Sequence, residues 1–209
     1  MAFKFIALGE ALFDIYNESD AESTNLELSG HGGGAPMNFI CACKKFGVNE
    51  CIFYSNLTKS NFSKKLIDIL KYFDVKHRTY RKAPEPPAAI VLDDGTFNFF
   101  ITRESLNFNS WSFKRRDFKG ADLFHFGSLY LTSSSGLNST KKAIRIAKRR
   151  NVKISFDLNF RPNILKILNL KEKIHIRKIK KFISYADFIK FDETEAEKIF
   201  GSSNPKKIF

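Results

Sequence analysis

A glycine run that leads into a helix signal is the most chemically suggestive feature of the chain. Residues 32–38 read Gly-Gly-Gly-Ala-Pro-Met-Asn, and three glycines let the backbone approach a ligand closely. Pro36 suits the first turn of a helix, and Gly47 suits the left-handed residue that ends one. We therefore expect a helix over residues 35–46, whose free N–H groups and dipole favour hydroxyl or anionic ligand oxygens. Asn38 adds a hydrogen-bonding side chain to this site.

The elements around this segment alternate between strands and helices. Apolar runs typical of strands cover residues 3–8, 51–54, 75–80, 122–126, 152–156 and 188–190. Helical patterns cover residues 35–46, 61–73, 138–150, 171–184 and 193–200. This alternation predicts an α/β fold, with a mainly parallel sheet covered by helices on both faces.

Two segments interrupt the alternation and resemble antiparallel strand pairs. Residues 12–16 face residues 26–28, and residues 88–92 face residues 97–101 across the turn signal Asp93-Asp94-Gly95. Such pairs would form a small β lid that excludes water from a pocket. We expect a single domain over residues 1–209 with lid insertions at about 11–30 and 87–103. A homodimer, if the chain forms one, would pair through this lid.

Polar residues follow four of the expected strands at the ends where a parallel sheet binds ligands. The clusters are Gly9-Glu10 with Asp14, Gly127-Ser128, Asp157-Asn159-Arg161, and Asp192 with Glu195. One such cluster would be ordinary, whereas four at one edge of a sheet predict a binding site.

Composition excludes several classes of protein. The 209 residues are 43% hydrophobic and 27% charged, as in a globular soluble protein, and contain no run long enough to span a membrane. The apolar start of the chain is interrupted by Glu10 and Asp14 too early for a secretory signal. Cys41, Cys43 and Cys51 lack metal-binding spacing, so we interpret them as reduced thiols of a cytoplasmic protein.

The net charge of +13 is concentrated in one stretch. Residues 141–181 hold 15 Lys or Arg against Asp157 and Glu172, whereas the rest of the chain carries 20 charges of each sign. Such a stretch can bind nucleic acid. In the helical segments 141–150 and 171–181 its basic residues alternate with apolar ones in helical period, without aromatic residues between them, which favours solvated helix faces instead.

Taken in order, these motifs resemble one family. Gly9-Glu10-Ala11-Leu12-x-Asp14, residues 33–38, His125-Phe126-Gly127-Ser128 and residues 155–162 are similar to the motifs of the ribokinase-like (PfkB) carbohydrate kinases, especially the fructokinase and 2-keto-3-deoxygluconate kinase branches. Residues 192–197, Asp-Glu-Thr-Glu-Ala-Glu, resemble the family's Asn-x-x-Glu motif with Asp in place of Asn. The resemblance covers residues 3 to about 201 and implies a ribokinase-like three-layer core with a small β lid.

The resemblance implies phosphoryl transfer from ATP to a sugar hydroxyl with the help of Mg²⁺. It assigns the sugar contacts to Asp14, Gly33, Gly34, Asn38, Arg103 and Arg161. It assigns Asp192 and Glu195 to the phosphates and, indirectly, to the hydrated metal. Each role has a structural alternative, since Asp14 could cap a turn, Arg103 could be a solvated lid residue, and Asp192 could cap the last helix.

The departures from the family concern its catalytic machinery. The Gly-Ala-Gly-Asp motif, which in the family supplies the anion hole and the aspartate base, does not occur, because Gly120-Ala121-Asp122 lacks the second glycine and leads into a strand. The family would continue for roughly another third of its length beyond Phe209, so its base would lie there. Thr102 and residues 59–63 also depart from the family pattern at the lid.

Three interpretations therefore remain open at the level of sequence. The first is an ATP-dependent sugar kinase lineage, fructokinase-like, without a catalytic residue in this chain. The second is a non-catalytic fragment or decayed product that at most binds sugar, and the third is a basic nucleic-acid-binding protein. The sugar itself is not specified by these residues.

Overall fold

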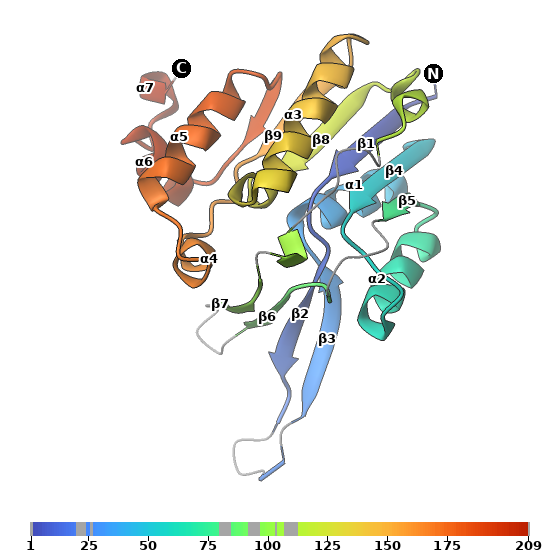
Figure 1. Cartoon of the computed structure of the whole chain (residues 1–209), viewed down its shortest axis with the longest axis vertical. Coiled ribbons are helices and arrows are strands. Elements are labelled where there is room, and N and C mark those ends of the chain that lie inside the picture. Colours follow the sequence, from blue (N-terminus) through green and yellow to red (C-terminus); the bar gives the residue numbers. More distant parts are fainter. Residues whose placement is uncertain are drawn as a thin grey trace.

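Six parallel strands form the central sheet of the protein (Figure 1). The computed structural model describes residues 2–19, 24–25, 27–79, 85–91, 97–102, 104–106 and 113–208. The strand order is β10-β9-β8-β1-β4-β5, with every neighbouring pair parallel. The bounds are β1 Lys4–Leu8, β4 Glu50–Ser55, β5 Lys76–Thr79, β8 Leu123–Gly127, β9 Lys153–Asp157 and β10 Phe188–Lys190. The predicted parallel sheet is confirmed.

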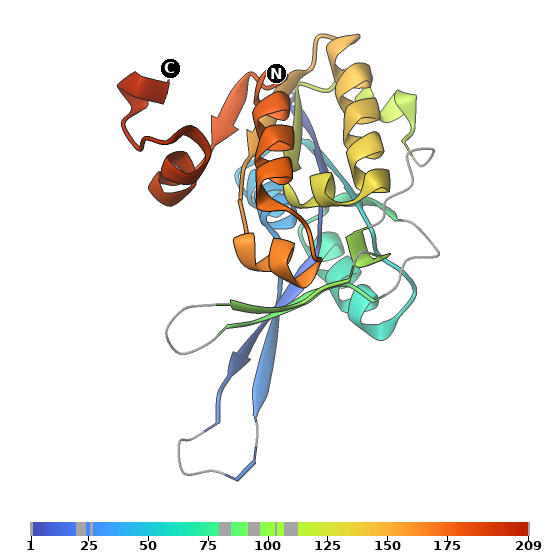
Figure 2. The same cartoon turned by 60° about the vertical axis from the view of Figure 1, so that its left-hand side comes forward.

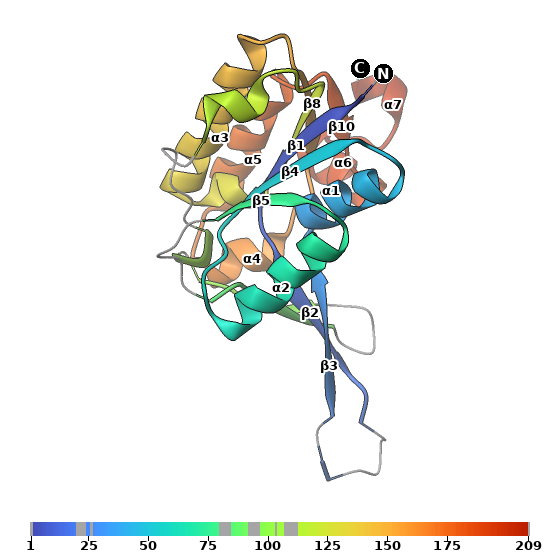
Figure 3. The ribbon, with the colours of Figure 1, turned by 90° about the vertical axis from the view of Figure 1, so that its right-hand side faces the viewer.

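Helices cover both faces of this sheet because successive strand side chains point to opposite sides. Ile6 and Leu8 pack into one core cluster with α3 (Ser134–Lys148) and α5 (Glu172–Ile183). Ala7, between them, packs into the other cluster with α1 (Ala35–Lys45) and α2 (Asn61–Tyr72). Figures 2 and 3 show these two helix layers on opposite sides of the strands.

A second sheet of four strands lies at one end of the molecule, away from both chain termini (Figure 1). Its order is β3-β2-β6-β7, with bounds β2 Leu12–Asn17, β3 Leu28–Gly33, β6 Ala88–Val91 and β7 Phe97–Phe100. Both pairs are antiparallel as predicted, although the second strand of the first pair lies later in the chain than expected, and a parallel pairing of β2 with β6 joins the two pairs into one sheet. The segments that the sequence assigns to a lid thus form a single small sheet.

Several sequence predictions need correction or fall outside the described residues. The strand expected at 26–28 instead runs from Leu28 through two residues of the glycine run. Helix α3 begins at Ser134 rather than at residue 138, because the Ser133 hydroxyl accepts a hydrogen bond from the Gly136 N–H at 3.0 Å and caps it. Leu26, Tyr80, Leu92, Arg103 and the Asp93-Asp94-Gly95 turn lie outside the described residues.

Shorter helices that the sequence patterns did not indicate complete the fold. They are α4 (Pro162–Ile167), α7 (Pro205–Ile208) and the 3₁₀ turns η1 (Glu104–Leu106), η3 (Arg115–Phe118) and η4 (Leu129–Thr132). Helix α6 spans Glu193–Phe200 as predicted. Within the described part of the chain, no helix combines the length and the apolar character that a membrane crossing requires.

A buried ionic network holds η3 against the central sheet. The Asp117 carboxylate accepts hydrogen bonds from the Tyr54 hydroxyl at 2.5 Å and from Arg78 Nε at 2.9 Å. A second guanidinium nitrogen of Arg78 lies 3.2 Å from the other carboxylate oxygen, so the pair is bidentate. Burial opposes ionisation of Asp117, but the hydrogen bonds from Arg78 and Tyr54 outweigh it and lower its pKa.

Replacing Asp117 by asparagine should lower the free energy of unfolding by about 1.5–3 kcal/mol, the range for hydrogen bonds to charged groups. Because the pKa of Asp117 is lowered on folding, its stabilisation is present at neutral pH and is lost as the pH falls below 3.8 through the folded-state pKa. Urea unfolding at neutral pH measures the loss. Asp68→Asn, which breaks only the surface pair with Lys71, is the control and should leave the midpoint nearly unchanged. Equal effects of the two substitutions would contradict the role of the network.

Candidate active site

A cavity of about 270 Å³ lies between the carboxyl ends of the central strands and the small sheet. Its walls come from the loop after β1, from β2, from the start of α1, from the loop after β9 and from β10. The lining residues include Glu10, Leu12, Asp14, Tyr16, Gly34, Ala35, Asn38, Phe99, Leu129, Asn159, Arg161, Ile164 and Lys190. Ligands of open α/β sheets bind at this edge, so the cavity occupies the expected position.

Four of the predicted sugar-binding residues line this cavity. Asp14 reaches it from β2, Gly34 and Asn38 from the start of α1, and Arg161 from the loop after β9. Gly33 lies beside Asp14, and a Cβ atom at Gly33 would stand 2.3 Å from the Asp14 carboxylate. A glycine is therefore required there for the aspartate to keep its position. Arg103, the remaining predicted contact, lies outside the described residues.

The start of α1 depends on the conformation of Gly34. Its φ of 103° lies in a region that residues with a side chain rarely adopt, and a Cβ atom would stand 2.6 Å from the Glu10 carbonyl oxygen. The close approach brings the first turn of α1 against the loop after β1. Helix α1 ends as predicted, with Gly47 at φ 95° and its N–H donating to the Lys44 carbonyl at 3.1 Å.

Asp192 and Glu195 are separated from the sugar-site residues by Arg161. They line an adjoining cavity of about 380 Å³, to which Arg161 and Phe99 also contribute. Asp192 caps α6 through a 2.8 Å hydrogen bond from the Glu195 N–H, and Glu195 returns a 2.9 Å bond from the Asp192 N–H. The other carboxylate oxygen of Glu195 accepts the Phe160 N–H. The cap that the sequence left as an alternative for Asp192 is therefore present.

Glu10 is the most strongly perturbed carboxyl group at the site. It is 3% exposed, and its Oε2 atom has no hydrogen-bond partner among the described residues. Burial is the main cause that raises the pKa of Glu10 to about 7, and nearby Asp157 acts in the same direction. Backbone hydrogen bonds from Glu10 and Ala35 and the charge of Arg161 act in the opposite direction. A raised pKa brings the protonated form within reach of neutral pH, so the carboxyl group can donate as well as accept a hydrogen bond in the cavity.

At two further carboxyl groups of the site, burial and basic neighbours shift the pKa in opposite directions. The pKa of Asp14 is raised by burial, while Arg161 and His31 act to lower it. The pKa of Asp157 is also raised by burial, although the Lys190 ammonium lies 3.3 Å from both of its oxygens. The site therefore combines acidic acceptors and cationic donors, which suits a ligand with both hydroxyl and anionic groups.

Five polar or aromatic residues of the wall were not predicted as sugar contacts from the sequence: Glu10, Tyr16, Phe99, Asn159 and Lys190. Glu10 and Asn159 belong to the polar clusters at strand ends, which was the signal available for them. Lys190 enters the site because β10 pairs in register with β9, opposite Asp157. Tyr16 and Phe99 belong to the small sheet, and no sequence motif marked them as site residues.

The carboxylates of the site do not form a preassembled metal centre. Among the described residues, no group of three or more His, Cys, Asp or Glu side chains could hold a metal ion. Asp192 and Glu195 direct three of their four oxygens to backbone N–H groups. This donor set fits contact with the water shell of a hydrated Mg²⁺ better than direct coordination.

The sequence and the fold match a family of carbohydrate kinases. The sequence profile of the pfkB family carbohydrate kinases matches residues 3–208, nearly the whole chain. The chain therefore belongs to the pfkB family of carbohydrate kinases.

Curated relatives and solved structures agree with this assignment. A probable fructokinase-5 of Arabidopsis thaliana is 28% identical over 207 residues, covering 91% of this chain and 60% of the relative. A fructokinase of Vibrio alginolyticus is 27% identical over 193 residues, covering 90% of this chain and 59% of the relative. The crystal structure of a fructokinase with bound ATP from Xylella fastidiosa superposes with a TM-score of 0.84 at 26% identity, over 95% of this chain and 64% of that one. The chain thus spans about three fifths of the length of these relatives.

Replacing Glu10 by glutamine should change how stability depends on pH. The folded protein retains a proton up to a pKa of about 7 that the unfolded chain releases near 4.5, so the Glu10 contribution becomes more unfavourable across that interval. Glu10→Gln should match the wild type near pH 5 and exceed its free energy of unfolding above about pH 8, by on the order of 3 kcal/mol.

Urea unfolding of both proteins from about pH 5 to 8.5 measures this difference. Glu18→Gln, at an exposed position just after β2, should follow the wild-type curve throughout. A constant offset between Glu10→Gln and the wild type at every pH would contradict a titrating buried carboxyl.

Proposed function

We propose that this chain provides the sugar-binding part of an ATP-dependent sugar kinase of the fructokinase type. The observation that carries the proposal is the convergence of Asp14, Asn38 and Arg161 on one cavity at the carboxyl edge of the sheet. These residues are distant in sequence, and their chemistry matches the hydroxyl and anionic groups of a sugar and its phosphate. The fructokinase relatives support the same substrate class.

In this proposal each side chain has a defined task. The Asp14 carboxylate accepts hydrogen bonds from two sugar hydroxyls, and the Asn38 amide donates or accepts a further bond. Backbone N–H groups at the start of α1 face ligand oxygens, which Gly33 and Gly34 leave accessible. Arg161 stands between the two cavities and holds oxygens of the transferred phosphate through its planar guanidinium group.

The adjoining cavity fits the phosphate end of ATP. Arg161 and Lys198 supply positive charge there, and Asp192 and Glu195 supply carboxylates that could orient a hydrated Mg²⁺. When bound, Mg²⁺ neutralises phosphate charge during phosphoryl transfer. Support for ATP also comes from the solved Xylella fastidiosa fructokinase, which contains it.

The competing interpretations differ from this one at specific points. A non-catalytic fragment would bind sugar in the same cavity without turnover. A nucleic-acid-binding protein would use residues 141–181, whose basic side chains are largely exposed on α3 and α5 and alternate with core residues, as expected for solvated helix faces. A homodimer through the small sheet stays a prediction.

Asp14 should be required for sugar binding. A sugar ligand at about 100 times its dissociation constant stabilises a protein by about 2.7 kcal/mol, so binding is visible as a rise in melting temperature. Fructose, 2-keto-3-deoxygluconate or ribose should raise the melting temperature of the wild type, and Asp14→Ala should abolish the rise. Glu27→Ala, at an exposed position just before β3 of the same sheet, is the control and should keep the full rise. Stabilisation that survives in Asp14→Ala would contradict the assignment of this residue.

The 209-residue chain assayed alone should phosphorylate sugars far more slowly than a normal kinase. It contains no Gly-Ala-Gly-Asp motif, and general-base catalysis contributes about 10²–10⁴-fold, with about 10²–10³-fold more per lost oxyanion donor. A coupled assay of ADP release should therefore show no sugar-dependent rate above ATP hydrolysis. The Vibrio alginolyticus fructokinase is the positive control. Sugar-dependent turnover of about one per second, typical of kinases, would show that a residue of this chain replaces the missing base.

A further inference from the structure

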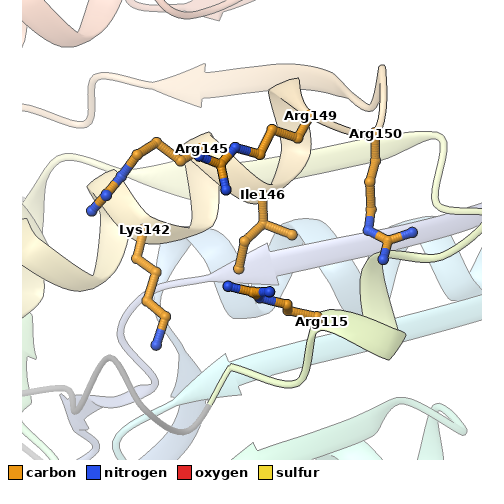
Figure 4. Close-up of a pocket in the computed structure, with 6 residues that line it drawn as sticks. All are labelled: Arg115, Lys142, Arg145, Ile146, Arg149 and Arg150. Atoms are coloured by element: carbon orange, nitrogen blue, oxygen red, sulfur yellow. The ribbon is translucent and has the colours of Figure 1, made fainter.

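A second cavity, lined almost entirely by cationic side chains, lies far from the proposed sugar site. Its volume is about 460 Å³, and its lining residues are Arg115, Lys142, Arg145, Ile146, Arg149 and Arg150 (Figure 4). Among the described residues, neither a carboxylate nor an aromatic ring lines it. Arg149 and Arg150 follow the last turn of α3, next to the amino-terminal end of β9, so the cavity lies toward the sheet edge opposite the strand carboxyl ends.

The cavity is formed by two segments that are distant in sequence. Lys142, Arg145 and Arg149 recur along one face of α3 and its cap, whereas Arg115 comes from η3 across the gap. Figure 4 shows the Arg115 guanidinium below Ile146, with Lys142 and Arg150 on either side. The η3 turn is held in place by the buried Phe118 ring and by the Asp117 network, so Arg115 has a firm support.

The arginines of the cavity are not neutralised within the described part of the chain. None of the ion pairs formed there involves Arg115, Arg145, Arg149 or Arg150. The carbonyl groups at the end of α3 stabilise some of these positive charges, because cations near a helix C-terminus interact favourably with the helix dipole. They do not account for Arg115, which belongs to another element and adds like charge to the same space.

We propose that this cavity binds a small anion that carries two or more phosphate groups. Guanidinium groups pair with phosphate oxygens in bidentate geometry, and several of them around one concave volume suit a chain of phosphates. The concave volume of about 460 Å³ suits a small molecule, and the described lining residues offer none of the aromatic stacking surfaces that single-stranded nucleic acid needs. The proposal does not rest on the kinase function, because the two cavities share no lining residue.

Isothermal titration with tripolyphosphate tests this proposal at about 150 mM salt, where diffuse surface attraction is screened. The wild type should bind tripolyphosphate in this cavity, and Arg115→Gln and Arg149→Gln should each weaken that binding at least tenfold. Arg116→Gln removes an exposed arginine from the same η3 turn without altering the cavity lining, and it should change the affinity less than twofold. Thermal unfolding without ligand verifies that all variants fold.

Two further binding measurements identify the site and the class of ligand. Arg161→Gln, at the sugar site, should keep tripolyphosphate binding, and loss of binding in this variant would move the anion to the other edge of the sheet and overturn the proposal. Equal weakening by Arg115→Gln and Arg116→Gln would also overturn it, because the effect would then be one of net charge. A single-stranded oligonucleotide could also bind more tightly than tripolyphosphate, with a dependence on Arg115. The ligand of the cavity would then be nucleic acid and not a small anion. Absence of any binding to the wild type would refute the proposal outright.

Discussion

The parallel alignment of the six central strands is the constraint on which the rest of the structure depends. Because all six run in one direction, the loops after β1, β8 and β9 and the end of β10 meet at a single edge. Glu10, Arg161 and Lys190 are brought together by that alignment alone. The small sheet adds Asp14 from outside and closes the cavity over the same edge.

Burial and charge act differently at the two ends of this sheet. At the carboxyl edge, Glu10 and Asp157 are withdrawn from water, so burial raises the pKa of each and leaves their protonation sensitive to Arg161 and Lys190. At the opposite edge, the arginines around the basic cavity remain exposed to water. One site is thus suited to recognising hydroxyl groups through hydrogen bonds, and the other is suited to attracting anions.

The chain belongs to the pfkB family, and the proposed sugar site lies at the carboxyl edge of its parallel sheet. The chain spans about three fifths of the length of its fructokinase relatives, and all the predicted sugar-binding residues lie within its first 161 residues. Asp192 and Glu195 form a capping box at the start of α6 while also lining the cavity beside Arg161. A role in fold stability and a role beside phosphates are compatible for these two carboxylates, because only some of their acceptor capacity is used by the backbone.

Local sequence patterns were enough to predict the parallel sheet, the main helices and part of the cavity wall, including Asp14, Asn38 and Arg161. Apolar periodicity and the Gly34-Pro36 helix start involve residues that are close together in the chain, so they can be recognised from the sequence alone. The sequence patterns misplaced the strand at 28–33, because glycines that suggest a loop are tolerated in β3, where pairing with β2 decides the conformation. Only the tertiary structure decided that Lys190 faces Asp157, that Glu10 is buried and that Arg115 joins α3 around a cavity. Each of these depends on contacts between segments distant in the chain, and burial and cavity shape are properties of such contacts rather than of local sequence.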